Sequence, residues 1–281
     1  MCGIAGIISV NKNEITTARL KAMTDAIAHR GPDGEGQWIS ADGRTGLGNR
    51  RLSILDLSDA GKQPMHYRGR YSISFNGAIY NYVELREMCI SKGYSFSSQT
   101  DTEVLMAMYD WKKEECLQHL DGMFAFALYD EQEKKLFVAR DRFGEKPFYY
   151  IAQPGQVFAF ASEMKALWAA GFKKKINKRM LYNYMAFNYT QNPADLSETF
   201  FENIRSLPPA HCIIIDTEPL HFHIKKYWDI DYDKIDAGIT IETAKEKFRE
   251  LFYTSVSRRL RSDFKAGSSL SGGLDSSIIV S

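Results

Sequence analysis

The most constraining feature of this sequence is a series of short apolar runs, interrupted by glycines, between Gly3 and Ser162. Such runs, bounded by turn-forming residues, are typical of β-strands. They read GIAGIIS, TGLGNRRLSIL, YSISFNGAIY, MFAFALYD, KLFVARD, FYYIA and QVFAFAS. Because antiparallel strands can share a core on one face, we expect these runs to form stacked antiparallel sheets.

Two amphipathic segments lie between the predicted strands. Apolar side chains recur at helical spacing in residues 14–29 and again in residues 102–111. The members are Leu20, Met23 and Ile27 in the first segment and Val104, Leu105, Met108 and Trp111 in the second. Helices outside and sheets inside define a layered α+β domain.

Composition argues against several kinds of partner. The 36 Lys and Arg residues nearly balance the 35 Asp and Glu residues, so no global field favours nucleic acid or an anionic membrane. No run of about 20 apolar residues predicts a transmembrane helix. The four cysteines have no C-x-x-C spacing and follow no secretory segment, which indicates reduced thiols and a cytoplasmic location.

The composition changes after Glu163, which predicts a domain boundary in the region that follows. KKKINKRMLYNYMAFNY indicates a basic entry to a helix, and YTQNPADLSE indicates a turn-rich connector. HCIIID and HFHIKKYWDI predict a hairpin, whose His221 and His223 we interpret as surface residues. From Thr240 we expect a long helix, and FKAGSSLSGGLDSSIIVS predicts a short strand, a Gly-Gly turn and the start of another helix.

The chain begins MCGIAGI, and the residues alone leave two interpretations of Cys2. A cysteine within an apolar run packs as a small hydrophobic strand residue. If processing removes Met1, Cys2 instead carries a thiol and a free α-amine, which are a nucleophile and a base on one residue. A thiol titrates near about 8.5 and an α-amine near about 7.7–8.0, so the amine can take up the thiol proton at neutral pH.

The stretch SLSGGLDSS has features of a phosphate cradle. Glycines make a tight turn after the predicted strand, and serine hydroxyls lie beside N–H groups at a helix start. We expect nucleotide binding by Leu270, Ser271, Gly272, Gly273, Asp275, Ser276 and Ser277. It is not a P-loop, because no lysine follows the glycines. Asp275 could help hold the metal that accompanies a nucleotide, although we assign no metal-ligand set, and a turn without a ligand remains the alternative.

A set of ordered motifs spans nearly the whole chain. They are MCGIAGI, HRGPDG, RRLSILDL, NGAIYN, TDTE, GMFAFALYD, RDRFGEKPFYY, SEMKAL and SGGLDSS. On these motifs the sequence resembles the N-terminal part of the glutamine-dependent asparagine synthetases, which join a class II glutamine amidotransferase domain to an ATP-pyrophosphatase domain. The resemblance favours the nucleophile interpretation of Cys2 and places it at the end of the first strand.

The resemblance also implies a fold and a domain order. The expected fold is α+β, with a four-layer αββα N-terminal nucleophile hydrolase domain followed by the beginning of an α/β ATP-pyrophosphatase domain. The expected divisions are residues 1–190 for the glutaminase, 191–239 for a connector and hairpin, and 240–281 for the truncated start of an ATP-dependent synthetase domain.

Residue roles around glutamine follow from the same resemblance. Asn76 and Gly77 would form the oxyanion hole, whereas from the residues alone Asn-Gly reads as a hairpin turn. Asp101 would contact the substrate α-amine, and it could also cap the following helix. The α-carboxylate would be held by Arg51, Leu52, Ser53, Ile54 and Leu55, and the loop that closes over glutamine would contain Arg30 and Gly31.

One position departs from the family pattern. The family usually has Glu where this chain has Ala78, and that carboxylate helps to recognise the α-amine of glutamine. We therefore expect Asp101 to be the charged partner of the amine and glutamine recognition to be weakened.

The function implied by the resemblance is a ligase with glutaminase activity. Cys2 would release ammonia from glutamine, and ATP and Mg²⁺ would serve the amidation of aspartate to asparagine in the complete synthetase, with no cofactor for the glutaminase half. Two alternatives stay open: an amidotransferase for another carboxylate, such as a sugar acid, and a non-catalytic module that retains the fold. The expected partners are small-molecule substrates and, in one possible assembly, a second copy of the chain, with no nucleic acid and no membrane.

Overall fold

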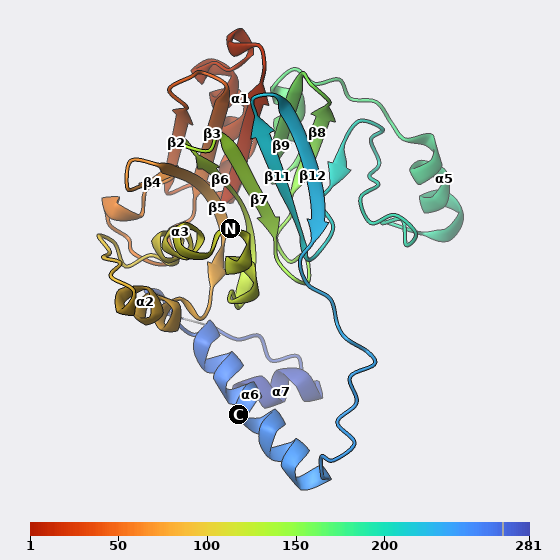
Figure 1. Ribbon diagram of the computed structural model, residues 1–281. Coiled ribbons are helices and arrows are strands. Elements are labelled where there is room, and N and C mark those ends of the chain that lie inside the picture. The colour runs from red at the N-terminus through yellow and green to blue at the C-terminus, as the bar shows by residue number, and fades with distance from the viewer. Residues whose placement is uncertain (266) are drawn as a thin grey trace.

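The computed structural model describes residues 1–265 and 267–281. Two six-stranded antiparallel sheets lie face to face, with strand orders β10-β8-β9-β1-β3-β2 and β12-β11-β7-β6-β5-β4 (Figure 1). The strands are β1 (Gly3–Ser9), β2 (Gly34–Ile39), β3 (Thr45–Arg51), β4 (Met65–Tyr67), β5 (Tyr71–Ile79), β6 (Gly122–Asp130), β7 (Lys135–Arg140), β8 (Tyr149–Gln153), β9 (Val157–Ala161), β10 (Arg205–Ser206), β11 (His211–Thr217) and β12 (Leu220–Lys226).

Helices cover the outer faces of both sheets, so the molecule has four layers (Figure 1). The α-helices are α1 (Thr17–Ala26), α2 (Tyr82–Ser91), α3 (Asp101–Lys112), α4 (Met164–Ala169), α5 (Lys178–Phe187), α6 (Ile241–Arg259) and α7 (Leu274–Val280). Short 3-10 helices are η1 (Lys12–Glu14), η2 (Ala28–Arg30), η3 (Asp59–Gly61) and η4 (Lys113–Gln118). The predicted α+β fold with helices outside two stacked sheets is confirmed.

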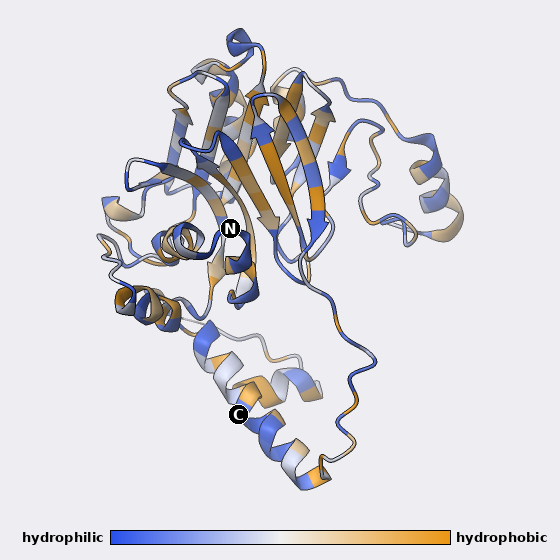
Figure 2. Cartoon of the chain, viewed as in Figure 1, coloured by the Kyte–Doolittle hydropathy of each residue, from blue (hydrophilic) through white to orange (hydrophobic). Residues whose placement is uncertain are grey.

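Three apolar clusters fill the three interfaces between the layers. Strand β6 shows how the sequence builds them, because Phe124, Phe126 and Leu128 pack toward α2 and α3, whereas Ala125 and Ala127 pack between the sheets. A strand with apolar neighbours on both faces needs a continuous apolar sequence rather than an alternating one. Figure 2 shows the resulting concentration of hydrophobic residues in the central strands.

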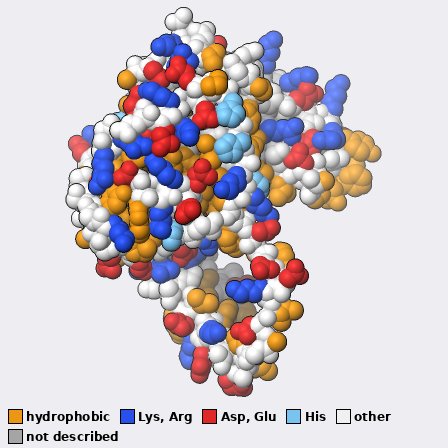
Figure 3. Space-filling view, in the orientation of Figure 1, with side chains coloured by type: hydrophobic (Ala, Val, Ile, Leu, Met, Phe, Trp, Pro, Cys, Tyr) orange, Lys and Arg blue, Asp and Glu red, His pale blue; other side chains and the backbone are white. Residues whose placement is uncertain are grey.

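The hairpin of β11 and β12 extends the second sheet, because β11 pairs with β7 along residues 212–216. The sequence placed this hairpin within a connector, 191–239, and the domain limits at 190 and 239 stay predictions. Helix α5 projects away from the sheets (Figure 1). Its exposed apolar side chains include Leu181, Tyr182, Tyr184, Met185 and Phe187. Figure 3 shows an apolar patch over this projecting part of the molecule.

The C-terminal part follows a connector, residues 227–240, that contains no helix or strand. The expected long helix is α6, which ends beside α2, where Arg258 contacts Glu84 (Figure 1). The expected strand ahead of the Gly272 turn is wrong, since residues 267–271 form none. A single extended segment with no neighbouring strand leaves its backbone groups without a ladder partner. No helix in the described part of the chain is both long and apolar enough to cross a membrane.

Candidate active site

Cys2 lies at the N-terminal end of β1, a central strand flanked by β3 and β9. Its Sγ accepts a hydrogen bond from the backbone N–H of Leu52 at 3.3 Å, and the thiol lies 3.5 Å from the carbonyl oxygen of Leu52 as a donor. Leu52 directly follows β3, whose Arg50 pairs with Gly3 in the ladder. The site therefore forms where the ends of these two strands meet.

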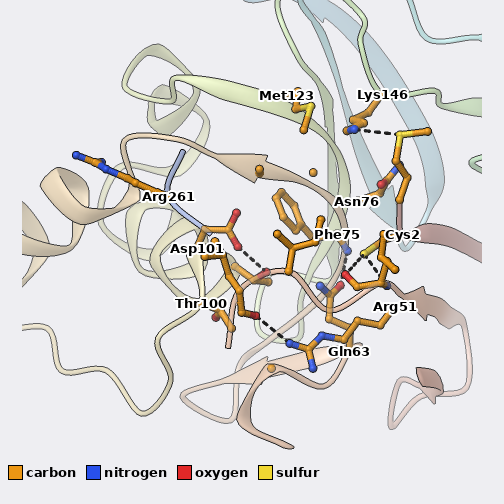
Figure 4. A pocket seen from close by; sticks show the side chains of 18 residues that line it. Cys2, Arg51, Gln63, Phe75, Asn76, Thr100, Asp101, Met123, Lys146 and Arg261 are labelled. Atoms are coloured by element: carbon orange, nitrogen blue, oxygen red, sulfur yellow. Dashed lines mark hydrogen bonds between the residues drawn. The ribbon is translucent and has the colours of Figure 1, made fainter. Parts of the chain in front are cut away.

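A pocket of about 130 Å³ opens beside Cys2 (Figure 4). A pocket of this size can admit the end of a small molecule. The predicted residues that line it are Cys2, Arg51, Leu52, Ile54, Leu55, Asn76, Gly77, Ala78 and Asp101. Ser53 lies beside the pocket rather than in its wall, and its N–H bonds to Asp33 at 2.8 Å. The structure thus brings together residues separated by up to a hundred positions.

The pocket electrostatics favour a protonated thiol that needs a base. Burial raises the pKa of Cys2, and the hydrogen bond from Leu52 N–H opposes that rise only in part. Burial lowers the pKa of the chain's α-amine, which in this structure belongs to Met1. An amine whose pKa is lowered is more often unprotonated at neutral pH, as a base for the thiol requires.

Lys146 lies next to the N-terminus and is buried. Its Nζ donates to Sδ of Met1 at 3.2 Å (Figure 4). Burial lowers the pKa of Lys146. A cation at this position would favour the thiolate over the thiol.

Arg30 lies in η2 and contacts the backbone of Cys2. Its Nε donates to the carbonyl oxygen of Cys2 at 2.9 Å, and its Nη1 bonds to Glu163 at 3.0 Å. The next residue, Gly31, packs closely against the backbone of Arg50, because a Cβ on Gly31 would lie 2.3 Å from the carbonyl carbon of Arg50. Neither Arg30 nor Gly31 lines the pocket, and their expected role in covering glutamine stays a prediction.

Arg51 shapes the loop that follows β3. Its guanidinium donates to the carbonyl oxygens of Leu55 at 3.1 Å and Asp56 at 2.5 Å. Its Nη2 lies so close to Gly61 that a Cβ at that glycine would be 2.0 Å away. These hydrogen bonds hold the loop together, and the loop forms one wall of the pocket.

Asn76 and Gly77 lie inside β5, not in a turn. They pair with Ala125 and Phe124 of β6, so the hairpin-turn alternative is wrong. The ladder continues through both residues because the following chain turns only after Ile79. Asn76 is buried, and its Nδ2 has no hydrogen-bond partner among residues 1–265 and 267–281. A Cβ on Gly77 would lie 2.3 Å from the carbonyl oxygen of Met123. A buried amide donor without a partner is suited to an oxyanion.

Asp101 is the first residue of α3, and its carboxylate is buried. The helix cap is Thr100, whose Oγ1 accepts from Glu103 N–H at 3.2 Å, so the cap alternative for Asp101 is wrong. The Oδ2 of Asp101 accepts from Ile79 N–H at 2.8 Å. Burial raises the pKa of Asp101 to about 6, with the hydrogen bonds opposing the shift. A cationic group that entered the pocket would stabilise the ionised form of the Asp101 carboxylate.

The predicted nucleotide-binding residues form a separate turn at the start of α7. The hydroxyls of Ser271 and Ser276 lie 2.9 Å apart, and the Ser277 hydroxyl donates to the carbonyl oxygen of Gly273 at 2.8 Å. Gly272 has φ of +81°, a conformation that favours glycine. Leu270 and Asp275 are exposed beside them.

Several lining residues were missed from the sequence. They are Met1, Gly61, Gln63, Phe75, Thr100, Thr102, Met123, Lys146 and Arg261. Thr100, Thr102 and Lys146 lie within the motifs TDTE and RDRFGEKPFYY, so membership of a motif could have identified them. Arg261 lines the pocket although it is distant in sequence from the other lining residues, and no local sequence pattern predicts such a contact.

Comparison with known proteins gives two family matches. A model described as glutamine amidotransferase domain matches residues 1–228, and one described as asparagine synthase matches residues 247–281. The glutamine phosphoribosylpyrophosphate amidotransferase of B. subtilis, in complex with ADP and GMP, is similar in structure, with a TM-score of 0.59 and 18% identity over 81% of this chain and 49% of that chain. This likeness shows that the two chains share the fold of stacked sheets between helical layers.

Curated relatives align with essentially the whole chain. Asparagine synthetase [glutamine-hydrolyzing] 1 of Bacillus subtilis is 39% identical over 100% of this chain and 43% of its own length. Amidase chry2 of Gibberella zeae is 34% identical over 99% of this chain and 42% of its own length. The chain thus spans less than half the length of these relatives. Since the first family model covers residues 1–228, the chain belongs to the glutamine amidotransferase domain family.

Proposed function

We propose that this chain hydrolyses glutamine to glutamate and ammonia, with Cys2 as the nucleophile. The observation that carries this proposal is the composition of one pocket, in which a thiol, a buried amide donor with no partner among the described residues and a buried carboxylate converge. These are the sulfur of Cys2, Nδ2 of Asn76 and the side chain of Asp101 (Figure 4). We assign the reaction to residues 1–228, since β11 and β12 belong to the second sheet.

Glutamine would bind with its two ends in different parts of the pocket. Asp101 would pair with the α-ammonium, while Arg51 and the backbone of Leu52, Ile54 and Leu55 would receive the α-carboxylate. Ser53 lies outside the pocket wall, so its predicted part in this contact would need the loop to shift. This orientation directs the side-chain carboxamide toward Cys2. Ala78 lines the same wall without a charge, so recognition of the ammonium depends on Asp101.

The chemical steps need only the chain, glutamine and water. After Met1 is removed, the α-amine of Cys2 takes the thiol proton, and the sulfur attacks the carboxamide carbon. Asn76 Nδ2 and the backbone N–H of Gly77 stabilise the resulting oxyanion. The α-ammonium of Cys2 returns a proton to the leaving ammonia as the C–N bond breaks. Water then hydrolyses the thioester to glutamate.

In a protein that carries the rest of the synthetase, as the relatives do, the ammonia would serve an ATP-dependent amidation, and we propose aspartate as the acceptor. This part rests on the asparagine synthase match and on the names of the relatives. ATP would activate the acceptor carboxylate, and Mg²⁺ would accompany it. The residues present fit phosphate groups, since Ser271, Gly273 and Ser276 converge at one exposed turn and Asp275 lies beside them for the cation.

A second candidate is an enzyme that amidates a different carboxylate. The relative named amidase chry2, at 34% identity, favours keeping this candidate. ATP–pyrophosphate exchange by the full-length gene product against a panel of carboxylic acids separates the two. A signal specific for aspartate supports asparagine synthesis, and a signal with another acid contradicts it. In either case we place the reaction in the cytoplasm, since all four cysteines are free thiols.

The glutaminase proposal is tested by glutamate and ammonia release from the purified chain. Cys2→Ala is expected to abolish release, and Cys2→Ser to reduce it strongly, with thermal melting unchanged. Intact mass gives the state of Met1, and activity is expected only where Met1 is absent. Cys89→Ser is a matched thiol control outside the pocket. Wild-type turnover by Cys2→Ala, or by a preparation that retains Met1, would contradict the mechanism.

A further inference from the structure

The segment from Arg258 to Asp263 contains the last two residues of α6 and the residues just after it. It contacts the glutaminase part at two places. At the first, Arg261 forms a two-pronged ion pair with Glu84, with Nη1–Oε2 of 2.6 Å and Nη2–Oε1 of 3.0 Å. The same Nη1 donates to the carbonyl oxygen of Tyr80 at 2.8 Å. This pairing lowers the pKa of Glu84 to about 2, with the Arg261 hydrogen bonds as the main cause.

The second contact is reciprocal and joins two backbone segments. The N–H of Asp56 donates to Oδ2 of Asp263 at 2.7 Å, and the N–H of Asp263 donates to the carbonyl oxygen of Ile54 at 3.2 Å. Asp56 has φ of +53°, a backbone conformation that costs free energy for a residue other than glycine. Asp263 therefore supports a loop conformation that the local sequence does not favour.

These two contacts lie on different walls of the glutamine pocket. Tyr80 directly follows β5, which carries Asn76, Gly77 and Ala78. Ile54 lines the opposite loop, and the carbonyl oxygen of Asp56 accepts from Arg51. Arg261 itself lines the pocket, on the side away from Cys2 (Figure 4). One short segment thus connects to both walls that would hold the amino-acid end of glutamine.

Arg258 and Arg261 both pair with Glu84, and Arg258 also pairs with Asp121, so this first contact is a small surface network that fastens α6 beside the end of β5. The Asp263 contact instead acts on one loop, through Asp56, next to Arg51. We propose that Arg261 and Asp263 are positioning residues for glutamine, which hold the Ile54–Asp56 loop and the end of β5 in the geometry that binds the substrate. This inference rests on the proposed glutaminase function.

The coupling must act in both directions, because a segment that stabilises the substrate-binding loop is itself stabilised when substrate occupies that loop. Glutamine binding is therefore expected to tighten the contact of residues 258–263 with the pocket.

Steady-state glutaminase kinetics test the positioning role. Arg261→Ala and Asp263→Ala are expected to raise KM for glutamine on the order of tenfold, the effect of one hydrogen bond to a charged group, while kcat changes less than about threefold. Asp263→Asn is expected to stay near wild type, because its amide oxygen can still accept from Asp56. Matched controls are Arg249→Ala and Asp233→Ala, which lie outside residues 258–263 and do not line the glutamine pocket.

A binding measurement separates this inference from the glutaminase proposal. In the Cys2→Ala background, glutamine is expected to slow hydrogen exchange in residues 258–263, and Asp263→Ala is expected to remove that effect and weaken binding. An active wild type with unchanged KM in both alanine variants overturns the positioning role alone. Equal KM increases in the Arg249 and Asp233 controls also overturn it. A wild type that neither hydrolyses nor binds glutamine overturns the proposed function and this inference together.

Discussion

Nε of Arg30 donates a hydrogen bond to the carbonyl oxygen of Cys2 at 2.9 Å, while Nη1 of the same guanidinium pairs with Glu163. Glu163 also bonds to His29 at 2.9 Å and to Lys165 at 3.0 Å. These partners lower the pKa of Glu163 to about 2, so the carboxylate is charged at any pH where the enzyme would operate. A charged network behind the nucleophile therefore holds the backbone of Cys2.

We expect Arg30→Ala to lower kcat for glutamine hydrolysis by roughly 10–100-fold, because a nucleophile displaced by a fraction of an ångström reacts far more slowly. KM should change little, since Arg30 does not line the pocket. Initial rates across a glutamine series give both constants. Lys165→Ala is the matched control, because Lys165 pairs with Glu163 without contacting Cys2. A large KM increase in Arg30→Ala would instead show that Arg30 covers the substrate.

Asn76 offers a cleaner separation of catalysis from folding. Because Nδ2 of Asn76 has no partner in the described structure, Asn76→Ala removes no internal hydrogen bond from that atom. We expect kcat to fall by about 10²–10³, the effect of one oxyanion-hole donor, with KM and the melting temperature nearly unchanged.

Ser74 is the contrasting position on the same strand. Its hydroxyl donates to the carbonyl oxygen of Gly48 at 2.8 Å, and it does not line the pocket. Ser74→Ala is therefore expected to lower the melting temperature more than kcat. If Asn76→Ala retains most of its turnover, the oxyanion assignment is wrong.

The central strands of both sheets were predictable because strand burial leaves a direct record in the sequence, whereas the edge strands β2, β4 and β10 were not predicted. The run of β6 is apolar at every position that faces either core, and the predicted strand boundaries lie within a few residues of those observed. The strand predicted before Gly272 failed for the opposite reason. Its residues have a suitable pattern, but pairing depends on a neighbouring strand that local sequence does not supply.

The candidate site was predictable only where residues act through a local motif. Asn76 and Gly77 were named from such a motif, although the same dipeptide is a common turn and only the ladder with β6 shows it as strand. Arg261 and Asp263 could not be found in this way. Their contacts join positions about two hundred residues apart, and the approach of α6 to α2 depends on tertiary packing.

Ala78 should limit recognition of glutamine. It lines the pocket near Asp101, and an ammonium that leaves water needs opposite charge or acceptors around it. We expect Ala78→Glu to lower KM for glutamine by about tenfold with kcat nearly unchanged, since a hydrogen bond to a charged group contributes on the order of 1.5–3 kcal/mol. Ala78→Gln, of similar size without the charge, is the control. Unchanged or raised KM in a folded Ala78→Glu variant would show that Asp101 already suffices.

Asp101 makes stability and substrate binding depend on pH in opposite ways. Its pKa is raised from 3.8 to about 6 by burial, so between these values the folded state binds more protons than the unfolded state. Stability from this group is therefore greatest below pH 3.8 and falls as the pH rises to about 6. Asp101→Asn keeps an acceptor for Ile79 N–H and removes the buried charge. We expect it to raise the free energy of unfolding at pH 7 by up to about 3 kcal/mol, and much less at pH 4.

The substrate reverses this preference, because the glutamine ammonium favours the ionised form of Asp101. Binding below pH 6 should thus release a proton, and KM for glutamine should rise as the pH falls through about 6. Calorimetry in buffers of different ionisation enthalpy measures the proton release in the Cys2→Ala background. Asp101→Asn should bind glutamine weakly with no proton release, and Asp33→Asn should retain it. Binding by Asp101→Asn that equals wild type would show that the ammonium is held elsewhere, and the gain in stability would then reflect burial of the carboxylate alone.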